Sequence, residues 1–298
     1  MGRELIGDKT HHQTATKNDS IPIQWVAFEI LTEEEGKRKY THKSDVWSFG
    51  VTMWEIFTHC EKEPYENMGD EEIVKYLMRG KRLEKKGEMN DEIYEIMKKC
   101  WEQNPSNRPT FSELYQQIKK LCPQSSSQET TITNFPISNI SNQSEEEEET
   151  FGTTQRKEIE RVKKGIEIEN ENEKQELERK IPLLKDIEIK NKLGEGNFGV
   201  VMYGIWENQE IAMKSIGSNK IRRLIKEANT LRSLQHPNVI RFYGIFKDDK
   251  GDYYLCIEFV SGGSLDHYLK KNQLSEKELL KLTISGLKGL KYLERYKK

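Results

Sequence analysis

Hydrophobic positions divide the chain into three zones with different spacing. Residues 1–121 alternate polar loops with helical patterns, and their longest apolar run, residues 46–57, is interrupted by Ser48 and Glu55. This run is too short to cross a bilayer, so it predicts a buried helix. Residues 122–180 are rich in Ser, Thr, Asn, Gln and Glu. That composition cannot bury enough apolar surface to offset the entropy of ordering, so this zone is predicted to be a disordered linker. Its second half is highly charged and is either an interrupted helix or solvated coil.

The third zone, residues 181–298, shows the spacing typical of strands. Two strand-like stretches flank a glycine-rich turn, and a third strand and a helical pattern follow. The predicted strands are residues 187–194, 199–206, 211–216, 242–248 and 252–260, and the predicted helices are residues 221–234 and 277–296. The predicted fold class is α+β, with a small antiparallel sheet that carries one helix and a larger helical part.

Charge and cysteine usage narrow the function classes. The formal net charge of −2 gives no global attraction to nucleic acid or to anionic membranes. The four cysteines are scattered and form no C-x-x-C pair, which indicates reduced thiols rather than a disulfide framework. We therefore expect a cytoplasmic protein with no nucleic-acid partner and no membrane segment.

A phosphate-binding pattern opens the third zone. The stretch GEGNFGVV matches G-x-G-x-x-G-x-V, with its glycines at Gly194, Gly196 and Gly199. Dinucleotide-binding folds share this fingerprint but place a helix after it. Here a strand follows, which favours a hairpin that covers phosphates with its backbone. The next strand, IAMK, carries Lys214, and Glu227 follows in the predicted helix, where an acid could hold a phosphate-binding lysine.

In combination these motifs resemble the eukaryotic protein kinase family. The resemblance continues through LQHPNVIRFYG and through LCIEFVSGGSL, which resembles the fifth strand and hinge of kinases. It implies ATP as the ligand, gripped by the lysine and the glutamate. It also implies that Val201 and Ala212 cover the adenine ring, that Ile257 is the gatekeeper, and that the backbone of Glu258 and Val260 hydrogen-bonds to adenine.

The first zone resembles the other half of a kinase of the tyrosine kinase and tyrosine-kinase-like branch. IPIQWVAFE is similar to the end of the activation segment, with Phe28 in place of the usual proline. SDVWSFGVTMWEIFT resembles the kinase F helix, in which Asp45 would be the buried aspartate that ties down the catalytic loop. CWEQNPSNRPTF resembles a signature of the same branch, and the resemblance implies an ion pair between Arg108 and Glu29.

Two kinase motifs are missing from the sequence. Neither H-R-D-x-x-x-x-N nor D-F-G occurs in the chain. In kinases these motifs hold the catalytic base and the metal ligands, so we predict no catalytic and no metal-ligating residue and no useful turnover by this chain alone. The domain order expected is the tail of a kinase helical lobe at residues 1–121, a linker at 122–180, and the sheet lobe, hinge and first helices of the helical lobe at 181–298.

Three explanations of this inverted order remain open. The chain is a fragment of a tandem or receptor kinase, or a permuted pseudokinase that acts as a binding or scaffold module, or one half of a complex in which another chain supplies the missing strip. In all three, the parent activity implied is ATP-dependent phosphorylation of protein hydroxyls. The choice between tyrosine and serine/threonine and the identity of a protein substrate or partner stay open.

Overall fold

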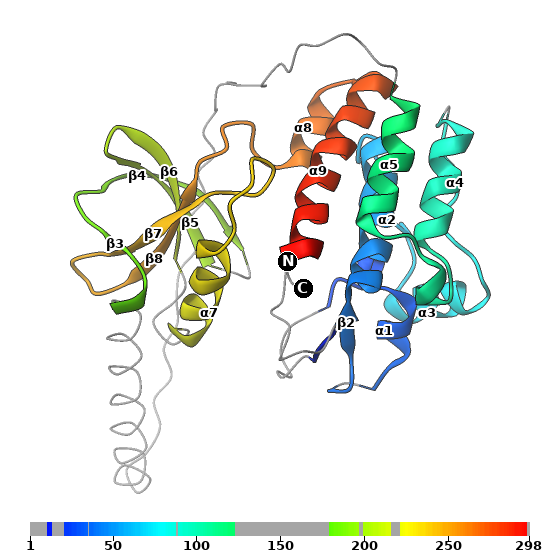
Figure 1. Cartoon of the computed structure of the whole chain (residues 1–298), viewed down its shortest axis with the longest axis horizontal. Coiled ribbons are helices and arrows are strands. Elements are labelled where there is room, and N and C mark those ends of the chain that lie inside the picture. The colour runs from blue at the N-terminus through cyan, green and yellow to red at the C-terminus, as the bar shows by residue number, and fades with distance from the viewer. Residues whose placement is uncertain are drawn as a thin grey trace, which may run out of the picture. The chain divides into compact units, whose positions relative to one another are not determined.

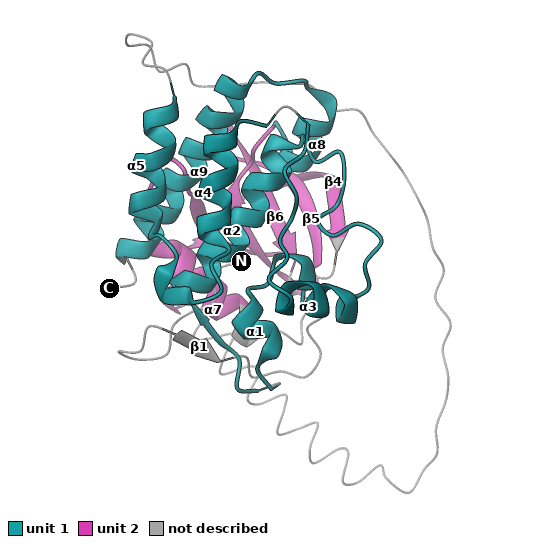
Figure 2. Ribbon diagram, turned by 90° about the vertical axis from the view of Figure 1, so that its right-hand side faces the viewer, with its two compact units in different colours: residues 1–131, 262–298 teal, residues 132–261 magenta. Residues whose placement is uncertain are grey.

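The computed structural model of the protein describes residues 11–13, 21–34, 36–87, 89–122, 179–196, 199–215 and 221–296. Contacts divide the chain into two compact units (Figure 2). Unit 1 comprises residues 1–131 and 262–298, and unit 2 comprises residues 132–261. The predicted linker lies almost entirely outside the described residues. Within those residues, no helix combines the length and the apolar character that a membrane span requires.

Unit 2 contains a six-stranded sheet and one helix. Its strands lie in the order β3-β7-β8-β6-β5-β4, and every neighbouring pair is antiparallel except β3 and β7. The strands are β3 (Leu183–Leu184), β4 (Glu188–Gly196), β5 (Gly199–Trp206), β6 (Gln209–Ser215), β7 (Phe242–Lys247) and β8 (Tyr253–Glu258), and the helix is α7 (Ile221–Arg232). The five predicted strands and the predicted helix are confirmed, while β3 was not predicted.

Local sequence explains the central hairpin of the sheet. Strands β5 and β6 pair through Trp206 and Gln209, which leaves Glu207 and Asn208 as a two-residue turn. Both turn residues have positive φ, 48° and 63°. A two-residue turn with this backbone matches the right-handed twist of the strands that it joins. The turn therefore sets the register that brings Ala212 and Lys214 opposite Tyr203 and Val201.

Each face of the sheet has its own apolar core. One core lies under α7 and contains Ile181, Leu224, Ala228, Ile245, Tyr253 and Leu255. The opposite face is filled by Leu184, Ile211, Met213 and Cys256. Alternation of side chains along the strands separates the two sets, because neighbours such as Leu255 and Cys256 point to opposite faces.

Unit 1 is mainly helical. It contains a short antiparallel pair of strands, β1 (His11–Gln13) and β2 (Lys39–Thr41). Its α-helices are α1 (Phe28–Thr32), α2 (His42–Phe57), α3 (Asp70–Met78), α4 (Asp91–Cys100), α5 (Phe111–Leu121), α8 (Leu265–Lys271) and α9 (Glu276–Tyr296). The predicted α+β fold class is thereby confirmed.

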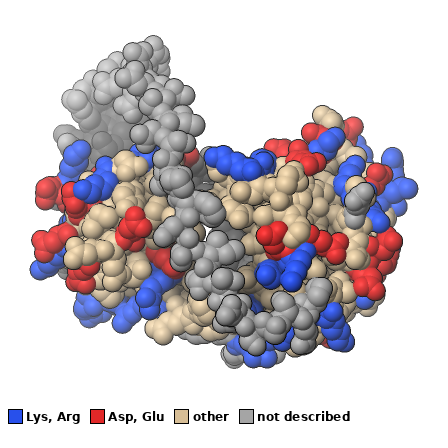
Figure 3. Space-filling model, turned by 90° about the horizontal axis from the view of Figure 1, so that it is seen from above, with Lys and Arg blue, Asp and Glu red and all other residues tan. Residues whose placement is uncertain are grey.

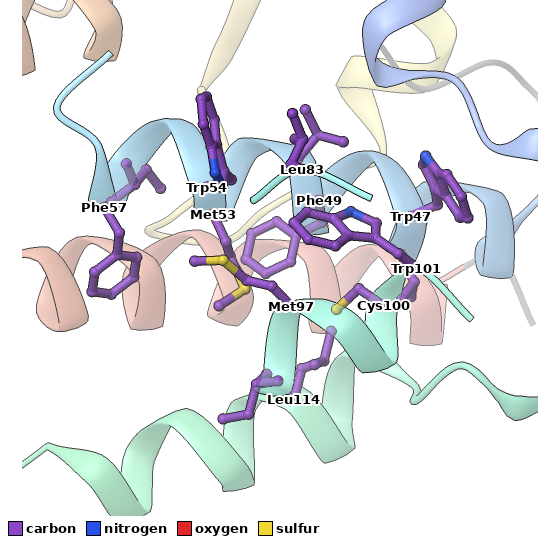
Figure 4. Packing of buried hydrophobic residues seen from close by; sticks show 14 of the residues in the cluster. Trp47, Phe49, Met53, Trp54, Phe57, Leu83, Met97, Cys100, Trp101 and Leu114 are labelled. Atoms are coloured by element: carbon purple, nitrogen blue, oxygen red, sulfur yellow. The ribbon is translucent and has the colours of Figure 1, made fainter. Parts of the chain in front are cut away.

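Helix α2 is the centre of unit 1. It begins at a capping box in which Thr41 and Ser44 exchange side-chain and backbone hydrogen bonds. Trp47, Val51 and Met53 on this helix are fully buried. Figure 4 shows side chains of α2 packed among those of α4 and α5. The predicted buried helix at residues 46–57 is confirmed.

Segments from opposite ends of the sequence share this core. Leu269 of α8 and Leu279, Leu280 and Leu287 of α9 belong to the same buried cluster as the residues of α2 and α5. Helix α9 lies beside α5 (Figure 1). The amphipathic pattern predicted this helix but not its neighbours, which precede it by most of the chain.

Charged side chains of both signs occur together on the surface seen from above (Figure 3). On the face seen in Figure 3, Lys and Arg are interspersed with Asp and Glu over the described residues. This mixing agrees with the near balance of 48 basic and 50 acidic residues.

Candidate nucleotide-binding site

One face of the unit 2 sheet carries the predicted nucleotide contacts. In the register of β5, β6 and β8, Val201 lies opposite Lys214, and Ala212 lies opposite Ile257. Directly paired residues point to the same face of a sheet, as do residues two apart in one strand. Val201, Ala212, Lys214 and Ile257 therefore share one face, which is the face that α7 covers.

Lys214 and Glu227 form an ion pair on this face. The Lys214 Nζ lies 2.8 Å from Glu227 Oε1, and the two side chains keep 21% and 30% of their exposure. Glu227 reaches the lysine because α7 packs on the sheet through Leu224 and Ala228, which flank it along the helix. The pair is thus held by the core on one side and open to solvent on the other. An ammonium fixed in this way can also donate hydrogen bonds to phosphate oxygens.

The glycine-rich turn joins β4 to β5. Gly196 and Gly199 face each other in the register, and residues 197–198 at the tip lie outside the described residues. Gly199 has φ of 108°, a conformation that residues with a Cβ rarely adopt. A Cβ placed on Gly194 would meet nothing within 4 Å, so the space beside this strand is open.

The predicted hinge residues lie at the end of β8 and just beyond it. The Glu258 N–H donates to the Arg241 carbonyl oxygen at 2.8 Å, so a contact from this residue to adenine would have to use its own carbonyl. The Val260 side chain is 52% exposed. Roles for Glu258 and Val260 in binding adenine stay predictions.

An aromatic pair beside this face was not predicted. Tyr203 lies opposite Ala212, and its ring centroid is 4.8 Å from that of Phe259. The Tyr203 hydroxyl donates to Glu210 Oε1 at 2.5 Å. The signal was present in the period of two from Val201 to Tyr203, but the contact to Phe259 needs the sheet register.

In unit 1, Glu29 and Arg108 form the ion pair that the resemblance implied. Arg108 donates to both carboxylate oxygens of Glu29, at 2.7 and 2.6 Å, and to the carbonyl oxygens of Lys43 and Glu102, each at 2.9 Å. Its side chain is fully buried and its guanidinium lies over the Trp47 ring. The pair ties α1 to the segment before α5.

Asp45 corrects one expectation. It was expected to be buried, but it is exposed in the first turn of α2. A carboxylate there is favoured by the unpaired N–H groups of the helix N-terminus, which is compatible with an exposed position.

A second contact that was not predicted lies in unit 1, where it joins the segment IPIQW to α2. The Trp25 Nε1 donates to Glu55 Oε2 at 2.8 Å. Burial raises the pKa of Glu55 above its ordinary value of 4.5, and the negative charges of Asp266 and Glu63 act in the same direction, against Trp25 and Lys270.

We expect this raised pKa to make the stability of unit 1 depend on pH. The folded state keeps the Glu55 proton to higher pH than the unfolded chain, so the contribution of Glu55 is most favourable below about pH 4.5 and is lost as the pH rises through its folded pKa. In Glu55→Gln the amide oxygen still accepts from Trp25 without a charge. Urea unfolding should show the variant gaining on the wild type between about pH 4 and about pH 7. Glu61→Gln, at an exposed position, is the control, and a gap that does not change with pH would contradict the expectation.

The buried cysteines are not reactive groups. Burial raises the pKa of Cys256 and of Cys100 to about 12. Cys256 also lies on the face of the sheet opposite Lys214. Among the described residues, no three His, Cys, Asp or Glu side chains are grouped as metal ligands.

Comparison with known families identifies the class. The family model for protein tyrosine and serine/threonine kinases matches residues 2–118 and 187–298, which is most of the chain. The chain therefore belongs to the protein tyrosine and serine/threonine kinase family, as its motifs predicted.

Individual relatives match shorter stretches. Fibroblast growth factor receptor 1 of Pleurodeles waltl is 40% identical over 126 residues, which cover 42% of this chain and 15% of the receptor. The same receptor of Xenopus laevis is 41% identical over 126 residues, with the same coverage. The tyrosine-protein kinase transforming protein RYK of Avian retrovirus RPL30 is 48% identical over 101 residues, 34% of this chain and 22% of that protein. The chain thus spans less than a quarter of each of these relatives.

Proposed function

We propose that unit 2 binds ATP, with Lys214 and Glu227 at the phosphates and the glycine-rich turn above them. The observation that carries this proposal is the 2.8 Å ion pair on the sheet face that also bears Val201 and Ala212. Family membership supports ATP as the ligand. Adenine would meet the apolar part of this face and the Glu258 carbonyl.

The parent activity we infer is phosphate transfer to protein hydroxyls. One relative is named as a tyrosine-protein kinase, which favours tyrosine as the acceptor. The sequence contains neither the kinase catalytic aspartate nor the metal-binding aspartate, and the described residues offer no substitute cluster for Mg²⁺. We therefore expect this chain alone to bind nucleotide without transferring phosphate.

The proposal predicts a large loss of nucleotide affinity in Lys214→Ala. A charge-assisted hydrogen bond contributes about 1.5–3 kcal/mol, so affinity for a fluorescent ATP analogue, measured in the presence of a chelator, should fall about 10- to 100-fold. Lys226→Ala removes the same charge from the exposed face of α7 and should bind like the wild type. Equal affinities of the two variants would overturn the proposal.

A second candidate is a permuted pseudokinase that acts as a scaffold. The observation in its favour is that α8 and α9 share one core with α2 and α5, although they come from opposite ends of the sequence. Phosphate transfer from ATP to a generic peptide, measured with and without a co-expressed catalytic segment, separates the scaffold from a complemented kinase. Transfer only with the added segment would favour the complemented kinase, and transfer by the chain alone would contradict the scaffold.

A further inference from the structure

Residues 179–184 lie along one edge of the unit 2 sheet, and we call them the strap. Within the strap, β3 pairs with β7 in parallel, with Leu183 opposite Ile245 and Leu184 opposite Phe246. The Ile245 N–H donates to the Pro182 carbonyl oxygen at 2.9 Å. The strap is therefore hydrogen-bonded to the sheet rather than merely lying against it.

The strap buries one side chain on each face of the sheet. Ile181 is 2% exposed and packs in the cluster that contains Leu224 and Ala228 of α7. Leu184 is 7% exposed and packs on the opposite face with Met213. Because its side chains pack on both faces of the sheet, the strap can leave β7 only if both contacts break.

The strap also contacts the end of α7 directly. Arg232, the last residue of the helix, donates to the Lys180 carbonyl oxygen. Glu227 lies between Leu224 and Ala228, which are both buried in the same core as Ile181. The strap thus contacts α7 at two places. One is formed by the core-facing side chains of the helix next to Glu227, and the other is the C-terminal end of the helix.

Strand β7 has a glycine where the strap passes. A Cβ on Gly244 would lie 2.6 Å from the Pro182 carbonyl oxygen and 2.9 Å from Leu184 Cδ2. These distances are far inside van der Waals contact, and the three nearest atoms all belong to the strap. Only glycine at this position lets the strap approach as closely as it does.

From these contacts we propose that the strap positions helix α7 and thereby holds Glu227 against Lys214. Ile181 and Gly244 are positioning residues, since neither touches the ion pair. The further consequence, that strap docking controls nucleotide affinity, rests on the proposed function. Whatever displaces residues 179–184 from β7 would then weaken the phosphate-binding pair.

Two substitutions in the full chain test this proposal. Gly244→Ala forces the strap away from β7, and Ile181→Ala empties its anchor under α7. Leu183→Ala is the matched control, because Leu183 also belongs to the strap but has a 38% exposed side chain. Ile181→Val is the conservative variant. The readouts are amide hydrogen exchange of the strap, of α7 and of the β5–β6 hairpin, and affinity for a fluorescent ATP analogue.

We expect Gly244→Ala and Ile181→Ala to speed exchange in the strap and in α7 about tenfold or more, with the β5–β6 hairpin unchanged. Affinity for the analogue should fall about fivefold or more. Leu183→Ala and Ile181→Val should match the wild type.

Three results would overturn the positioning role. In the first, the two substitutions speed amide exchange in the strap but not in α7. In the second, they speed exchange in the β5–β6 hairpin as much as in α7. In the third, the strap stays protected from exchange even in Ile181→Asp. A wild-type chain that fails to bind the analogue would overturn the proposed function instead, and α7 exchange would still decide whether the strap positions the helix.

Discussion

Replacing Glu29 by alanine is expected to lower the free energy of unfolding of unit 1 by about 3–5 kcal/mol. The substitution leaves the fully buried Arg108 guanidinium with two backbone carbonyl partners and no counter-charge. Two neutral acceptors do not offset the free energy lost when a guanidinium leaves water, and the guanidinium is out of water only in the folded state. The substitution therefore destabilises the folded state. Urea unfolding followed by tryptophan fluorescence measures the loss, because four of the five tryptophans lie in unit 1.

Glu34→Ala provides the matched control. Glu34 pairs with Lys37 at the surface, where its side chain is 77% exposed, and exposed pairs contribute about 0–1 kcal/mol. A Glu29→Ala loss no larger than that of Glu34→Ala would show that the Arg108 pair does not hold α1 to the rest of unit 1.

The second large effect is expected at the contact between α9 and the earlier helices. Leu287 is fully buried in the cluster that joins α9 to α2 and α5. Leu287→Asp removes this apolar contact and places a carboxylate in the core, which should cost about 4–5 kcal/mol or more. The free energy of unfolding of a whole domain is about 5–15 kcal/mol, so this substitution should remove much of the stability of unit 1.

Hydrogen exchange of α2 and α5 measures this effect. Both helices should lose protection in Leu287→Asp, because they share the core that α9 completes. Lys288→Asp introduces the same side chain at the next, exposed position of α9 and should leave the protection intact. Protection of α2 and α5 that survives in Leu287→Asp would mean that residues 21–122 hold their core without α9.

Much of unit 2 was accessible from local patterns. Strand alternation and the helical period each depend on residues close in sequence, so they can be recognised without a fold. The 13-residue separation of Lys214 and Glu227 was interpretable only through the kinase resemblance, and the structure then brings the two side chains to 2.8 Å.

Other features needed contacts between distant segments. The strap carries a strand of only two residues, too short for alternation to be read, and its Ile181 is buried because α7 and β7 come to it. The Trp25–Glu55 hydrogen bond spans 30 residues, and nothing in either local pattern indicates it. Asp45 was expected to be buried by family resemblance, and the position of the α2 N-terminus places it at the surface.

The sequence by itself thus determined the glycine-rich turn and most strands and helices, because each is encoded by neighbouring residues. It also indicated the family and the lysine and glutamate of the candidate phosphate site, through motifs that resemble those of kinases. The tertiary structure alone decided which segments share a core. It joined α9 to α2 and α5 and docked residues 179–184 on β7. The physical reason is that an apolar face specifies only that it must be covered, whereas the partner that covers it is selected by shape and register across the whole fold.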